Sequence, residues 1–252
     1  MIKRLVLVVA ALSPAAVPAA GGGGHAPYWE QPNVNLGDKA SLQRGAQLFA
    51  NYCMGCHAAR HHRWMHVADD LGIPEDVVEE NLIWTTDADG KKRRVGSLMT
   101  SAMTTEYGEQ VFGKKPPDLT LTARSQGAAW VYNYLRTFYL DESSPTGVDN
   151  AVLSGASMPH VLWPMQGWQR PVYEEDAHGE GTHIAGFELV SEGSMSPEEY
   201  DRAVNDIVNF MVYLGEPARL DRTAIGGWVL FSLVVFLVFA VLLKKEYWKD
   251  VH

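Results

Sequence analysis

The chain of 252 residues is predicted to form a mainly α-helical domain that is followed by one C-terminal transmembrane helix. First, apolar residues recur at helical spacing within 41–52 and within 196–214. Second, residues 224–243 carry neither charge nor proline. At 1.5 Å per residue this segment reaches about 30 Å, the thickness of the hydrocarbon layer of a membrane. Third, few segments show the alternation of a strand, and no internal repeat is visible.

Composition excludes several broad classes of protein. Hydrophobic residues make up 46% of the chain and charged residues 20%, which is too apolar for a disordered chain and too charged for a polytopic membrane protein. The formal net charge of −9 excludes nucleic acid as an expected partner. The chain has only two cysteines, so a framework of disulfides cannot hold distant segments together.

The expected helices have recognisable ends. Ser41 can cap the first helix, and Gly45 within it allows another helix to approach closely. Ser196 and Glu199 form a predicted capping box for a later helix, which ends before Pro217. Further segments follow weaker signals, with helices expected at 75–84 and 128–139, a turn at 87–90 and a polar surface excursion at 167–186.

The two ends of the chain predict its topology. Residues 1–20 have the charges, short apolar run and small residues of a secretory signal peptide. The tail 244–252 begins with lysines, so the positive-inside rule places it in the cytoplasm. Residues 21–223 then form a periplasmic domain held by the helix 224–243. Without the two positive charges of the signal and the net single positive charge of the tail, this domain carries −12. That acidity indicates either a basic partner or good solubility.

The two cysteines belong to the sequence Cys53-Met54-Gly55-Cys56-His57. This is the attachment signature of c-type haem, in which both thiols bond to one haem and the adjacent histidine reaches the iron. Two alternatives are a redox dithiol and a zinc site completed by His61, His62 or His66. Export of the domain and the histidine directly after Cys56 favour haem.

A sixth ligand to the iron is expected on the opposite face of the haem, and methionine is the usual partner of histidine. Met195 is the preferred candidate because it lies in a loop just before a capped helix. Met158 is the second candidate because Pro159 stiffens its loop. Met65 lies too close to His57, and Met211 falls within an apolar helical pattern. The remaining histidines that could bind iron are His61, His62, His66, His160, His178 and His183.

An ordered set of short motifs resembles the cytochrome c1 family of the quinol–cytochrome c reductase (bc1) complex. These motifs are Pro116-Pro117-Asp118-Leu119-Thr120, Arg124, Tyr134-Leu135 with Tyr139, Pro145-Thr146-Gly147 and Met158-Pro159. The resemblance covers essentially the whole mature chain and implies a class I cytochrome c-like haem domain with long insertions, whose first and last helices cross. It also implies one covalently attached haem c, held by Cys53, Cys56 and His57. Met195 would be the distal ligand, and Arg124 would pair with a haem propionate. The chain lacks the second cysteine pair of mitochondrial members.

The same resemblance implies a function. The chain would be a single-pass subunit of the inner membrane, in contact with lipid and with cytochrome b in a dimeric complex. It would accept an electron from the Rieske iron–sulfur protein and pass it to a soluble cytochrome c. It would thus belong to an oxidoreductase without itself making or breaking bonds. Two alternatives are an independent membrane-anchored monohaem cytochrome c or oxidase haem subunit, and a zinc-stabilised binding module.

Overall fold

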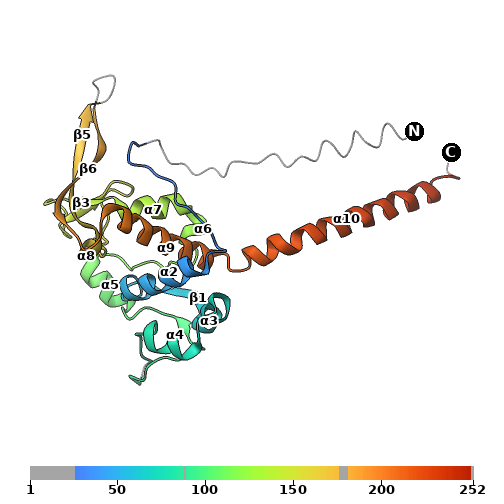
Figure 1. Cartoon of the computed structure of the whole chain (residues 1–252), viewed down its shortest axis with the longest axis horizontal. Helices are drawn as coiled ribbons and strands as arrows, with labels where there is room; N and C mark the ends of the chain where they lie inside the picture. Colours follow the sequence, from blue (N-terminus) through green and yellow to red (C-terminus); the bar gives the residue numbers. More distant parts are fainter. Residues whose placement is uncertain (1–25, 88, 176–180, 251–252) are drawn as a thin grey trace.

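The computed structural model describes residues 26–87, 89–175 and 181–250, which form a head from which one long helix extends (Figure 1). The predicted signal peptide over 1–20 lies outside the described residues. The helices are α2 (Lys39–Tyr52), α3 (Trp64–Leu71), α4 (Glu75–Asn81), α5 (Thr105–Phe112), α6 (Thr122–Ser125), α7 (Ala128–Arg136), α8 (Trp163–Gln166), α9 (Pro197–Gly215) and α10 (Arg219–Tyr247). The strands are β1 (Ala59–Arg63), β2 (Leu98–Met99), β3 (Phe138–Leu140), β4 (Val148–Asn150), β5 (Gly167–Glu175) and β6 (Thr182–Glu192).

Helices α2 and α9 begin at side-chain caps. The carboxylate of Asp38 accepts a hydrogen bond from the backbone N–H of Ser41, so α2 begins earlier than the predicted cap at Ser41. In α9 both bonds of the capping box form between Ser196 and Glu199, with Pro197 in the first turn, as the sequence predicts. Burial of one face of each helix then stabilises them, because capping contributes only about 1 kcal/mol.

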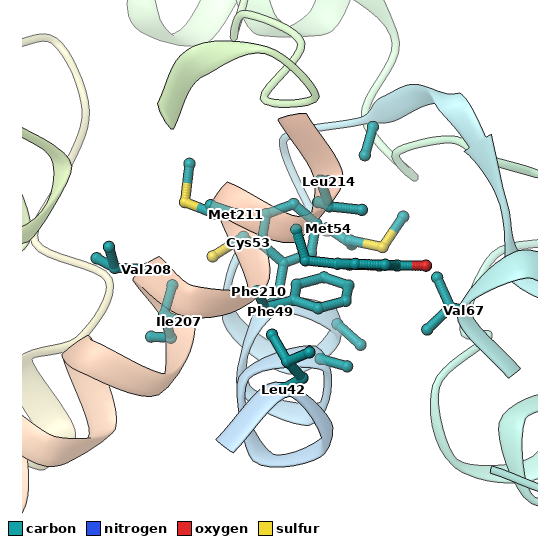
Figure 2. Packing of buried hydrophobic residues seen from close by; sticks show 14 of the residues in the cluster. Leu42, Phe49, Cys53, Met54, Val67, Ile207, Val208, Phe210, Met211 and Leu214 are labelled. Atoms are coloured by element: carbon teal, nitrogen blue, oxygen red, sulfur yellow. The ribbon is translucent and has the colours of Figure 1, made fainter. Parts of the chain in front are cut away.

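The core of the head is the crossing of α2 and α9. A Cβ atom added at Gly45 would lie 2.0 Å from the carbonyl oxygen of Asp206, so only glycine permits this approach. Phe49 and Phe210 pack beside it with their ring centroids 5.4 Å apart (Figure 2). The Asp206 carboxylate accepts hydrogen bonds from Ser41 and Arg44 of α2 at 2.6 Å each. Apolar contact and buried polar bonds therefore fix the same crossing.

The expectation of few strands is wrong for the region after α7. Three two-stranded antiparallel sheets occur among the described residues: β1 with β2, β3 with β4, and β5 with β6. Strands β5 and β6 form a long hairpin where a surface excursion was predicted, and its far end projects from the head (Figure 1). Much of the hairpin is exposed on both faces, so its sequence does not alternate between apolar and polar residues. The helices predicted at 75–84 and 128–139 are shorter, since 128–139 includes the beginning of β3.

Helix α10 contains the predicted span 224–243 and extends beyond both of its ends. It points away from the head, and within the described part of the chain its apolar residues are covered by nothing (Figure 1). Its length, and a mean hydropathy of 2.7 over an 18-residue stretch of it, suit a membrane-spanning helix. Such a large exposed apolar surface is stable in lipid but not in water.

Candidate haem site

The cysteine motif forms a tight turn at the end of α2. Cys53 is the C-cap residue, and its N–H donates to the carbonyl of Phe49. The carbonyl of Cys53 then accepts from the N–H of Cys56 at 3.1 Å and from that of His57 at 2.8 Å. This turn carries both sulfurs and the imidazole to the same cavity.

The orientation of His57 is set by the segment that follows α5. Its Nδ1 lies 2.8 Å from the carbonyl oxygen of Pro117, so Nδ1 carries the proton and Nε2 remains as the acceptor atom. Burial lowers the pKa of His57, although the Pro117 bond and the charge of Asp118 oppose that effect. The neutral imidazole that a metal needs is therefore the stable form at neutral pH. Asp118 accepts from Arg60 N–H at 2.8 Å and holds this segment against the motif.

The cavity has a volume of about 330 Å³ and lies between two sets of elements. One set is the motif with the segment 112–122, and the other is α7 with the loop 153–161. Helix α9 contributes Ile207 and Met211, which belong to the same buried cluster as Cys53 (Figure 2). The lining is mostly apolar, with aromatic side chains at Tyr52, Phe112, Trp130 and Tyr134. A flat apolar group with a central metal fits such a slot. A second hollow of about 320 Å³ contains neither cysteine nor His57 among its lining residues.

The environment of the thiols argues against the two alternatives. Burial raises the pKa of Cys53 to about 12, and burial also raises that of Cys56. A redox dithiol needs the opposite, a thiolate at neutral pH. Across 26–87, 89–175 and 181–250, no cluster of three His, Cys, Asp or Glu side chains could hold a metal ion, so the geometry of a zinc site is not formed there.

The two candidate methionines lie in different places. Met158 lines the cavity, and its sulfur accepts a hydrogen bond from the Tyr134 hydroxyl at 3.6 Å. Met195 is absent from the described lining and packs, partly buried, against the core. Its N–H donates to the carbonyl of Met165 at 3.1 Å, which ties this loop to α8. The structure therefore brings Met158, and not Met195, to the cavity that holds the cysteines and His57.

Two further predicted residues also lie away from the cavity. Arg124 is an exposed residue of α6, and its guanidinium is 3.5 Å from the carbonyl oxygen of Gly215 at the end of α9. The cations that do line the cavity are Lys114 and Lys115, which the sequence reading did not single out. Nε2 of His62 donates to the carbonyl oxygen of Leu214 at the end of α9, at 2.9 Å. Among the described histidines, His57 alone lines the cavity, and His178 lies outside the described residues.

The loop that carries Met158 is held by one carboxylate. Asp149 accepts hydrogen bonds from the N–H groups of Asn150, Gly155 and Ala156 at 2.8, 2.7 and 3.3 Å. Burial alone would raise the pKa of Asp149, but these bonds lower it below the ordinary carboxyl value. The charged carboxylate is thus the form that fixes the loop. No local pattern in the sequence indicates this role, because Asp149 lies in a short strand ahead of the turn that it organises.

Comparison with known proteins is consistent with this geometry. The sequence profile described as the Cytochrome C1 family matches residues 29–251. A cytochrome c1 of Allochromatium vinosum is 47% identical over 254 residues, which cover 100% of both chains. A protein of Nitrosomonas europaea named ammonia monooxygenase gamma subunit is 44% identical over 87% of each chain. The mitochondrial cytochrome b-c1 complex catalytic subunit of Candida albicans is 25% identical over 94% of this chain and 82% of that one.

Proposed function

Because this chain belongs to the cytochrome c1 family, we propose that it is the haem c electron-transfer subunit of a bacterial bc1 complex. The observation that carries the proposal is the cavity in which Cys53, Cys56, His57 and Met158 meet. A bound haem would supply one-electron exchange between ferrous and ferric iron. The chain itself would hold, orient and desolvate that group, with no bond chemistry of its own.

Each residue of the site has a definite role in this proposal. Cys53 and Cys56 would form the two thioether bonds, and His57 would bind the iron through Nε2 while Pro117 holds Nδ1. We assign the distal position to Met158 in place of Met195, because Met158 lines the cavity and Met195 does not. Arg124 is exposed on α6, and this position does not support its predicted role as the partner of a haem propionate. The crossing of α2 and α9 at Gly45 supports the class I cytochrome c arrangement.

The proposed setting follows from α10 and from the family. Helix α10 would anchor the chain in the inner membrane, with the head in the periplasm after removal of residues 1–20. The head would take electrons from a Rieske iron–sulfur protein and deliver them to a soluble acceptor such as cytochrome c. Cytochrome b and a second copy of the complex would complete the assembly. The alternative of an independent membrane-anchored cytochrome predicts instead that the chain purifies without cytochrome b.

Two measurements test the proposal. The full chain, purified from membranes in mild detergent, should retain haem after denaturation and should co-purify with cytochrome b. If the chain were recovered with monooxygenase subunits instead, it would belong to an ammonia monooxygenase, as the name of the Nitrosomonas relative implies. Absence of covalent haem would refute the haem site.

The distal ligand is tested by a matched pair of variants. Met158→Leu should abolish the charge-transfer band of sulfur-ligated ferric haem and lower the reduction potential, whereas Met195→Leu should change neither. Both variants should keep covalent haem, because the cysteines are untouched. The opposite pattern would return the ligand to Met195.

A further inference from the structure

The mouth of the haem cavity has a charge opposite to that of the chain as a whole. Lys114 and Lys115 are both exposed, and they are the charged residues among the described side chains that line the cavity; none of that lining is acidic. The chain nevertheless carries a formal net charge of −9. A partner that approaches within the screening length of about 8–10 Å would sense the local lysines more strongly than distant carboxylates.

Apolar side chains lie exposed beside these lysines. Leu153 is 48% exposed and lines the cavity, and Val111 at the end of α5 is 51% exposed next to the lining residue Phe112. Isolated exposed apolar residues are ordinary on a protein surface. Here Leu153 lines the cavity itself, and Val111 directly precedes a lining residue that is followed by the two lysines. We call Val111, Phe112, Lys114, Lys115 and Leu153 the mouth surface.

The acidic residues nearest in sequence, Glu109 and Asp118, are absent from the cavity lining. The Asp118 carboxylate accepts hydrogen bonds from the N–H groups of Arg60 and Thr120 at 2.8 and 3.0 Å. Gly108 packs against Pro116, since an added Cβ there would lie 2.6 Å from the proline ring. That contact turns the face of α5 with Gly108 and Phe112 toward the cavity, because residues four apart share a face. Glu106, two positions from Gly108, is on the opposite side of the helix. Glu174 and Glu175 lie at the far end of β5, well away from α5 (Figure 1).

We propose that the mouth surface docks an electron-transfer protein whose contact face carries carboxylates around an apolar patch. This rests on the proposed function and specifies the chemistry of its soluble acceptor. The step transfers one electron: the ferrous protein becomes ferric and the acceptor is reduced by one electron, with no bond or proton exchanged. The net acidity of the head then serves solubility, and a basic acceptor is not the preferred partner.

Small ions of known charge test the local field without knowledge of the partner. The purified, pre-reduced complex is mixed with ferricyanide, an anionic one-electron oxidant, or with tris(phenanthroline)cobalt(III), a cationic one. We expect oxidation by ferricyanide to slow as salt is raised, and oxidation by the cobalt complex to accelerate. The double variant Lys114→Glu/Lys115→Glu should oxidise about tenfold more slowly with ferricyanide at low salt. It should also reverse both salt dependences.

A matched control separates local from total charge. Lys39→Glu/Lys91→Glu makes the same change in net charge at exposed positions outside the cavity lining, and it should leave the salt dependences as in the wild type. The proposal is overturned if the wild-type rate with ferricyanide rises with salt, or if both double variants behave alike. With protein oxidants of matched potential, an acidic cytochrome should react faster than a basic one, and the reverse order would also overturn it. A preparation that lacks covalent haem gives no oxidation signal, so failure of the proposed function is recognised separately.

Discussion

Replacing Gly45 by alanine should separate the two helices that hold the haem cavity together. The added Cβ would lie 2.0 Å from the carbonyl oxygen of Asp206 and 2.8 Å from Cβ of Phe210. Ordinary contact begins near 3.4 Å, so α9 has to move by roughly 1.4 Å relative to α2. Overpacking costs about 1–3 kcal/mol. We expect the upper end, because a backbone carbonyl cannot rotate away from the new methyl group.

The effect should appear in both stability and ligation. A loss of about 3 kcal/mol corresponds to a fall of roughly 6–12 °C in the Tm of a domain of this size. Cys53 and His57 follow α2, whereas Met211 lies on α9, so moving the two helices apart also widens the cavity. Thermal unfolding followed by circular dichroism measures the first effect, and the intensity of the sulfur-ligation band measures the second.

Gly96→Ala is the matched control for this experiment. No described atom lies within 4 Å of a Cβ added at Gly96, so the free energy of unfolding of this variant should stay within about 0.5 kcal/mol of the wild type. If Gly45→Ala unfolded at the same temperature as Gly96→Ala, the inferred closeness of the two helices would be refuted.

Three further predictions concern the site and the anchor. Tyr134→Phe removes the hydrogen bond to the sulfur of Met158, so the sulfur should become a stronger electron donor to the iron. The reduction potential should then fall in a redox titration, while the ligand set stays intact. Asp149 has a lowered pKa, so its contribution to stability is present above the ordinary carboxyl value of 3.8 and declines as pH falls below it. Asp149→Asn should therefore reduce sulfur ligation at neutral pH and flatten its acid dependence, as spectra between pH 6 and 3 would reveal. Ending the chain after Thr223 should give a haem protein that remains in solution without detergent, because α10 supplies the exposed apolar surface.

Much of the fold follows from local chemistry that a sequence displays. Both capping bonds between Ser196 and Glu199 form as predicted, and the turn from Cys53 to His57 is a local arrangement of backbone hydrogen bonds. Gly45 also predicts a close helix approach correctly, because nothing larger fits there. The hairpin of β5 and β6 was not predicted, because its strands do not alternate between apolar and polar residues. Its register depends on pairing between the two strands, which no local pattern reveals.

The distal ligand shows where local reasoning ends. A helix cap indicates that the chain beside Met195 is held in place, and its capping bonds do form, but the cap does not decide the direction of the adjacent side chain. Met195 packs against the core, and its backbone is tied to Met165. Met158 reaches the cavity through contacts that come from other elements, with Asp149 holding the loop before it and Tyr134 of α7 bonding to its sulfur. These contacts join residues up to 24 positions apart, so spacing near the methionine could not reveal them. A proline beside Met158 was a weaker local signal than the capping box, yet the hydrogen bond from Tyr134 and the loop contacts of Asp149 hold Met158 at the cavity.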